Sequence, residues 1–160
     1  MKLEIIKLLY LKMLQKNTLF EDNLKISDID KDGKAFDKVS RIEGIAEDSK
    51  CKISLDVNSD VYAVSKENYY QILITKSLIA DGTPSPNNFT FDLYTKKNSL
   101  MDLYDYVTYG KIFKYSEEPN GKVSIYASFG GLLLGITGSA SHLSSLAMDE
   151  RIYLLLKKLD

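Results

Sequence analysis

The sequence predicts an all-β protein built as an antiparallel β-barrel that is closed or nearly closed. Short segments that alternate apolar and polar residues recur along the chain, turn residues separate them, and no strand-helix-strand alternation is present. Eleven Tyr and six Phe but no Trp and only three Pro agree with β structure. A chain of 160 residues suits one domain with a sizeable core.

Residues 1–17 are expected to form an N-terminal extension, helical or disordered, ahead of a single barrel domain at residues 18–160. The apolar run of the extension is interrupted by charges and is too short to span a bilayer, so no membrane segment is expected. If the extension is helical, one face carries Leu3, Ile6, Tyr10, Met13 and Leu14.

The stretch "DIDKDG", residues 28–33, begins like the calcium-binding loop of an EF-hand, with Asp28, Asp30 and Asp32 followed by Gly33. The closing Glu of such a loop is missing, because position 12 is Val39. The flanking segments "EDNLKIS" and "KVSRIEGIAE" also lack a helical repeat of apolar residues. The stretch is therefore predicted to be a turn between two strands, with Gly33 at positive φ and carboxylates bonded to nearby backbone N–H groups.

The next predicted strand, "CKISLDV", contains the one cysteine of the chain. Cys51 shares a face with Ile53, Leu55 and Val57, which predicts a packed core thiol rather than a nucleophile. A single cysteine cannot form an internal disulfide, and this favours a reducing compartment.

Further strands are expected at "YYQILITKSL", "YDYVTYGKIFKY", "VSIYASF" and "LLLGITG", and the final "RIYLLLKKL" is expected to be a strand that closes the sheet. Gly110 predicts a bulge or bend, and "EEPNG" at residues 117–121 predicts a hairpin turn. Gly130 and Gly131 predict a sharp bend, and "SHLSSL" predicts one helical turn. Residues 79–101 have no sustained period and are expected to form a long mobile loop.

The motifs of common enzyme classes are missing. No phosphate-binding glycine loop is present, and the one histidine, His142, excludes schemes that need two imidazoles. Cys51 and His142 lack the paired spacing of a zinc site. We therefore expect no catalytic residues, no cofactor and no metal.

The aromatic run Tyr104, Tyr106, Tyr109, Phe113 and Tyr115 has two interpretations. It could be a platform on which single-stranded nucleic acid stacks, or it could be half core and half protein interface. Residues 18–160 carry a net charge of −4 and the chain has only two Arg, which disfavours contact with a phosphate backbone. A protein interface is the favoured interpretation.

Six segments in this order and at this spacing are similar to one known family. They are "LFED" (19–22), "DIDKDGKAFDKVSRIE" (28–43), "LDVN" (55–58), "DYVTYGKIFK" (105–114), "SFGGLLL" (128–134) and "RIYLLLKKL" (151–159). The chain resembles the small subunit, eighth by the customary count, that is shared by the nuclear RNA polymerases I, II and III. The resemblance covers about residues 18–160.

The resemblance implies a barrel of the oligonucleotide/oligosaccharide-binding (OB) kind and a non-catalytic subunit in the nucleus. It implies docking on the largest subunit of each polymerase, contact with other core subunits and no direct contact with nucleic acid. The partner interface implied by the family's recognisable segments comprises Tyr106, Tyr109, Gly110, Phe129, Gly130, Gly131, Leu132 and Leu133. One departure is Gly135, where many members have Arg. The alternative function is a free OB-type module that binds single-stranded nucleic acid.

Overall fold

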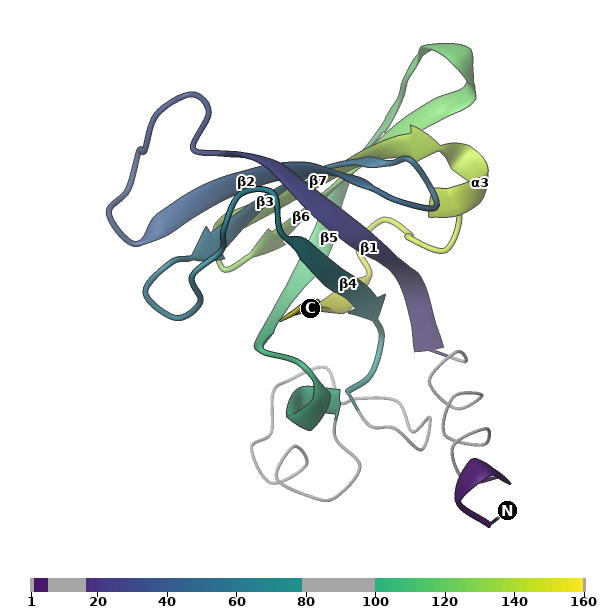
Figure 1. Ribbon diagram of the computed structural model, residues 1–160. Helices are drawn as coiled ribbons and strands as arrows, with labels where there is room; N and C mark the ends of the chain where they lie inside the picture. The colour runs from purple at the N-terminus through teal and green to yellow at the C-terminus, as the bar shows by residue number, and fades with distance from the viewer. Residues whose placement is uncertain (1, 6–16, 79–99, 160) are drawn as a thin grey trace.

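A computed structural model of the protein describes residues 2–5, 17–78 and 100–159, and its strands form a closed β-barrel (Figure 1). The all-β prediction is confirmed. The elements in chain order are β1 (Thr18–Ile29), β2 (Val39–Ala46), β3 (Lys52–Asn58), β4 (Tyr69–Thr75), the 3-10 helix η1 (Leu100–Leu103), β5 (Tyr106–Glu117), the 3-10 turn η2 (Pro119–Gly121), β6 (Lys122–Phe129), β7 (Leu132–Ser139), the short helix α3 (Ala140–Leu143) and β8 (Arg151–Lys158).

The strands follow the order β1-β2-β3-β7-β6-β5-β8-β4 around the barrel, and β4 pairs with β1 to close it. Every pairing is antiparallel. The last strand, β8, lies between β4 and β5, so the prediction that the final segment closes the sheet is confirmed. A closed barrel leaves no long unpaired strand edge.

The interior of the barrel is filled by the apolar side chains that alternation placed on one face of each strand. Cys51 has an exposed fraction of 0% and packs among them, as predicted for a core thiol. Leu143 of α3 and Leu146 close one end of this core. The predicted helical turn at residues 141–146 is thereby confirmed in α3, which holds an exposed His142.

A second apolar cluster lies outside the barrel, on the outer face of β4, β8 and β5. Leu73, Tyr153 and Leu155 form it with Leu100 of η1 and Leu78. Strand β8 is therefore buried on both faces, which explains why its sequence is a continuous apolar run rather than an alternating one.

The turn at "DIDKDG" connects β1 to β2, so the prediction of a turn between strands is confirmed. Gly33 has a φ of 94°, and its N–H donates to the carbonyl oxygen of Asp30 at 3.0 Å. The carboxylate of Asp30 accepts a hydrogen bond from the backbone N–H of Arg41 at 2.9 Å. The acidic residues of this turn thus help to connect the two strands.

The predicted bulge at Gly110 was wrong in position. Gly110 pairs in register with Ile152, and the pairing of β5 with β6 shifts between Ile112 and Lys114 instead. Gly110 is needed for close packing, because a Cβ there would collide with the carbonyl oxygen of Ser128 and with the ring of Phe129.

The hairpin and the bend predicted on either side of β6 are confirmed. Asn120 and Gly121 have φ values of 65° and 72° and lie in the turn that connects β5 to β6. The hairpin formed by these two strands reaches beyond the barrel body (Figure 1). Gly130 and Gly131 have φ values of 64° and 98° and connect β6 to β7. A two-residue turn with positive φ at both positions matches the twist of the strands it joins.

Two predictions fall mostly outside the described residues. Most of the predicted loop, 79–99, lies outside them, and its last two positions, Leu100 and Met101, belong to η1. The N–H of Leu100 donates to the carbonyl oxygen of Leu78 at 2.8 Å, so the two ends of the segment meet. Of the predicted extension, residues 2–5 are helical and most of the rest lies outside the described residues. No helix in the described ranges is long and apolar enough to cross a membrane.

Candidate partner interface

The β6–β7 turn exposes backbone to solvent at Gly130 and Gly131. A Cβ added at either position would meet no atom within 4 Å, so the space around the turn is open. The N–H of Gly131 donates to Oγ of Ser128 at 3.1 Å, which holds the turn on the end of β6. Glycines in such a turn allow the backbone of another molecule to approach closely.

The two leucines that follow the turn point to opposite faces of β7. Leu132 is half-buried and packs against the barrel core, whereas Leu133 is 41% exposed. Of these two leucines, only Leu133 can contact a partner with its side chain, because the side chain of Leu132 would first have to leave the core. We call Gly130, Gly131 and Leu133 the turn surface.

The buried carboxylate of Asp56 contacts the backbone of the turn surface at Leu133. Asp56 of β3 accepts hydrogen bonds from Nε and Nη2 of Arg41 at 2.7 and 3.1 Å, and from the backbone N–H of Leu133 at 3.0 Å. The hydrogen bonds and charge of Asp56 raise the pKa of the Arg41 guanidinium, which therefore stays charged. Regular pairing of β3 with β7 ends at Leu55 and Leu134, and Asp56 extends that connection to Leu133.

Tyr106 lies in the barrel rather than on its surface. Its exposed fraction is 7%, and its hydroxyl accepts a hydrogen bond from the backbone N–H of Asn58 at 3.3 Å. Its ring stacks on Tyr62, with 5.7 Å between the ring centroids and 20° between the planes. The Tyr62 hydroxyl donates to Oδ2 of Asp105 at 3.1 Å. Burial is the larger cause, and the contact with Asp105 the second, of a raised pKa of Tyr62. Tyr106 is thus part of the barrel core, and Tyr62 packs against it.

Tyr109, Gly110 and Phe129 also have packing roles. Tyr109 packs against the outer cluster, where its ring centroid is 4.7 Å from that of Tyr153. Phe129 is 5% exposed in the barrel core, and Gly110 makes room for its ring. The structure therefore divides the eight predicted interface residues: Gly130, Gly131 and Leu133 are exposed together, and the other five fill the barrel or its outer cluster.

Sequence reasoning missed Arg41 and Asp56. Alternation placed Asp56 on the outer face of its strand, where a carboxylate is ordinarily solvated. The only signal in the sequence was that one of two arginines stands in the strand before it. The pairing of Arg41 with Asp56 depends on the β2–β3 register, which the sequence does not give.

Residues of β1, β2, β3, β6 and β7 line a shallow groove of about 330 Å³. Its lining includes the small residues Ser54 and Gly135 and the ring of Tyr126. A Cβ at Gly135 would lie 3.3 Å from that ring, so a larger residue there would press on Tyr126. Among the described side chains, no group of three or more His, Cys, Asp and Glu is arranged to hold a metal ion.

Comparison with known proteins identifies the family. Residues 21–158 match the family described as RNA polymerase Rpb8. A protein of Dictyostelium discoideum named DNA-directed RNA polymerases I, II, and III subunit rpabc3 is 45% identical over 88% of this chain and 96% of its own length. Subunit 8B of the DNA-directed RNA polymerases II, IV and V of Arabidopsis thaliana is 37% identical over 88% of this chain and 96% of its length. The subunit RPABC3 of Saccharomyces cerevisiae is 33% identical over 89% of this chain and 99% of its length. Since the match spans almost the whole barrel, the chain belongs to the RNA polymerase Rpb8 family.

Proposed function

We propose that this chain is a non-catalytic structural subunit common to RNA polymerases I, II and III, and that it works in the nucleus. The observation that carries the proposal is the 45% identity, over 96% of its length, to a protein named as a subunit of all three polymerases. The similarity reaches from β1 to β8 and so includes the strands that build the barrel and both sides of the turn surface.

The turn surface is the part of the barrel that we assign to contact with the largest subunit of each polymerase. Gly130 and Gly131 allow close backbone approach, and the 41% exposed Leu133 offers an apolar anchor beside them. The backbone N–H of Leu133 donates to Asp56, and Arg41 in turn holds that carboxylate. This connection helps to fix the backbone of Leu133 before a partner arrives, which reduces the entropy lost on binding. Contacts with other core subunits would use other faces of the barrel.

The placement of the aromatic run disfavours the alternative of a free module for single-stranded nucleic acid. Tyr106 fills the barrel and Tyr109 packs on the outer cluster, so these two rings face away from each other. Only Phe113 and Tyr115 of the run are strongly exposed, each at 46%. A stacking platform needs successive rings on one accessible face.

Affinity purification tests the proposed function. The full chain with an affinity tag is expressed in cells that contain nuclear polymerases and recovered from a nuclear extract at moderate salt. We expect the largest subunits of polymerases I, II and III to be recovered with it. Recovery of none of them would contradict the proposal.

A nucleic-acid titration separates the alternative function. The purified chain is titrated into labelled single-stranded oligonucleotides at two salt concentrations. We expect no saturable binding, because the chain carries a net charge of −1. Tight binding that weakens steeply with salt would instead support a nucleic-acid-binding module.

A further inference from the structure

A row of positive charges crosses β8 and β5 on the outside of the barrel, beside one exposed and one half-buried aromatic ring. Arg151 and Lys111 pair directly across the β8–β5 ladder, and Lys114 pairs with Tyr126 across the β5–β6 ladder. Phe113, which is 46% exposed, lies between the two lysines. We call Arg151, Lys111, Phe113, Lys114 and Tyr126 the basic strip.

The shift in register at Phe113 places both lysines on the outer face. Ile112 is buried in the barrel core, and the Lys114 ammonium lies 5.3 Å from the centre of the Tyr126 ring on the outside. With one extra residue between Ile112 and Lys114, two successive side chains of β5 can lie on the outer side. Without that extra residue, alternation would send Lys114 toward the interior.

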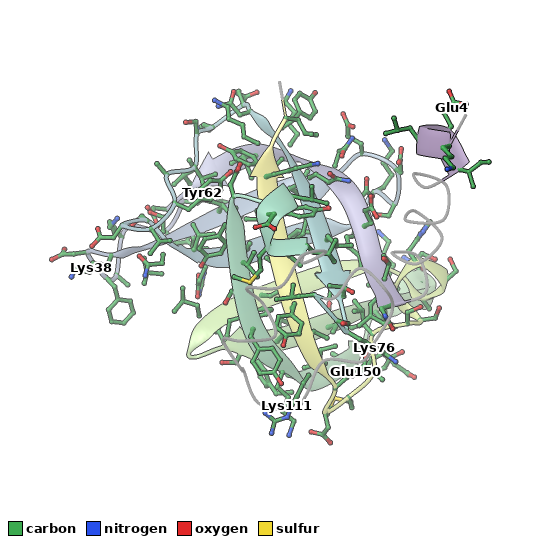
Figure 2. The ribbon with its side chains drawn as sticks, turned by 90° about the horizontal axis from the view of Figure 1, so that it is seen from below. Glu4, Lys38, Tyr62, Lys76, Lys111 and Glu150 are labelled. Atoms are coloured by element: carbon green, nitrogen blue, oxygen red, sulfur yellow. The ribbon has the colours of Figure 1, made fainter. Side chains whose placement is uncertain are left out.

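The cations of the basic strip are poorly neutralised. Lys111 has one ion pair, with Asp149 at 3.7 Å, and within the described ranges neither Lys114 nor Arg151 forms one. Glu150, the other nearby carboxylate, pairs with Lys76 at 3.5 Å. Figure 2 shows Lys76, Glu150 and Lys111 on one side of the barrel, well away from Lys38.

The arrangement is unfavourable in the free protein. Like charges directly opposite each other on neighbouring strands repel, and Arg151 and Lys111 are such a pair. The domain otherwise has an acidic balance, so this local excess of positive charge stands out. An anionic partner would remove the repulsion on binding, and this gain would add to its affinity.

We propose that the basic strip binds an extended, acidic polypeptide segment that also carries an apolar side chain. Carboxylates at alternate positions of an extended segment lie about 7 Å apart on one face, so several of them can reach cations that are spread along β5 and β8. Phe113 and Tyr126 lie beside the cations and can take an apolar side chain of the segment. A nucleic acid fits less well for two reasons. The strip has only three cations, and the carboxylates of Asp149 and Glu150 beside them would repel phosphates. The strip adjoins the turn surface, because Lys111 pairs with Ser128 and Ser128 pairs with Leu133. Its test uses a free peptide, so the result does not depend on docking through the turn surface.

Fluorescence anisotropy tests the proposal with the purified full chain. The probe is a labelled peptide of about twelve residues in which Glu alternates with Ser and one Phe is central. A matched peptide with Gln in place of Glu and an oligothymidine of about twelve nucleotides serve as comparisons. The variant combines Lys111→Gln, Lys114→Gln and Arg151→Gln. The control combines Lys25→Gln, Lys38→Gln and Lys66→Gln, which removes equal charge from exposed ion pairs elsewhere.

We expect the Glu peptide to bind the native chain and the control, and to bind the strip variant about tenfold more weakly. We also expect urea unfolding of the strip variant to be unchanged or to need more urea, because a repulsion has been removed. Equal binding to the native chain and the strip variant would overturn the proposal, as would no preference for Glu over Gln. Tighter binding of the oligothymidine, lost in the strip variant, would also overturn it and would identify a nucleic-acid surface.

Discussion

The carboxylate of Asp56 and the guanidinium of Arg41 face each other across the β2–β3 ladder, joined by hydrogen bonds of 2.7 and 3.1 Å. The same carboxylate accepts the backbone N–H of Leu133 in β7 at 3.0 Å. One side chain that is only 10% exposed therefore connects three strands at the point where the ladder between β3 and β7 has ended. Leu133 is thus connected on both sides, to Asp56 of β3 and, through the β6–β7 ladder, to Ser128.

Replacing Asp56 tests that connection. We expect Asp56→Ala to lower the free energy of unfolding by about 1–3 kcal/mol, because the N–H of Leu133 loses its acceptor. Urea unfolding measures the change. Asp60→Ala is the matched control, since Asp60 is exposed and pairs with Lys38 at 3.7 Å, and we expect it to cost little. Equal losses in the two variants would show that the Asp56 connection contributes nothing of its own.

A second buried carboxylate predicts how stability depends on pH. Burial alone would raise the pKa of Asp22, but hydrogen bonds from Ser49, Asp48 and Asn23 outweigh it, and the pKa falls below its ordinary value of 3.8. The stabilisation that this depressed pKa provides is therefore complete above 3.8. It is lost as the pH falls below 3.8 through the folded-state pKa.

Asp22→Asn is expected to lower stability at neutral pH and to flatten the loss of stability as the pH falls below 3.8. Urea midpoints measured across this range check the prediction, with Asp28→Asn as the control because Asp28 lies at the surface in an ion pair of 4.0 Å. An acid-induced loss as steep in Asp22→Asn as in the native chain would contradict the assignment.

The thiol of Cys51 is expected to react only when the barrel opens. Its exposed fraction is 0%, and burial raises the pKa of Cys51, so thiolate is scarce in the native state. A disulfide reagent added near neutral pH should label the native chain slowly and the urea-unfolded chain at once. Fast labelling of the native chain would mean that the strand end holding Cys51 opens readily.

Tyr106 is expected to affect folding rather than docking. Tyr106→Phe leaves the N–H of Asn58 without its partner and should cost about 1 kcal/mol. Tyr106→Ala leaves a cavity in the core and should cost about 3–5 kcal/mol. Urea unfolding measures both. If Tyr106→Ala kept full stability but was not recovered with polymerase, Tyr106 would belong to the interface after all.

The strands were predictable because one face of each has to be buried. In "CKISLDV" and "VSIYASF" the apolar positions recur at every second residue, and the structure places Ile53, Val57, Val123 and Phe129 in one core. Turns were predictable where the backbone needs positive φ, as at Gly33 and Gly131. These features depend on local sequence alone.

The interface was harder to predict because it depends on which face of a strand a side chain occupies in three dimensions. Tyr106 and Tyr109 are three positions apart on β5, so they point to opposite faces, and both faces of that strand are partly covered. The outer cluster exists because Leu78 and Leu100 meet over β8, and this contact joins residues far apart in the sequence. The role of Asp56 depends in the same way on strand register.

Docking through the turn surface is the central claim, and a substitution at Leu133 tests it most directly. Leu133→Asp puts a charge on the apolar anchor, and Phe36→Asp places the same change on a side chain that is 71% exposed in the β1–β2 loop. Both variants are first checked for native stability by urea unfolding and then purified with a tag from nuclear extract. We predict that Phe36→Asp recovers the largest subunits of polymerases I, II and III at the native level, whereas Leu133→Asp recovers each about tenfold less. Native recovery with Leu133→Asp would contradict the claim.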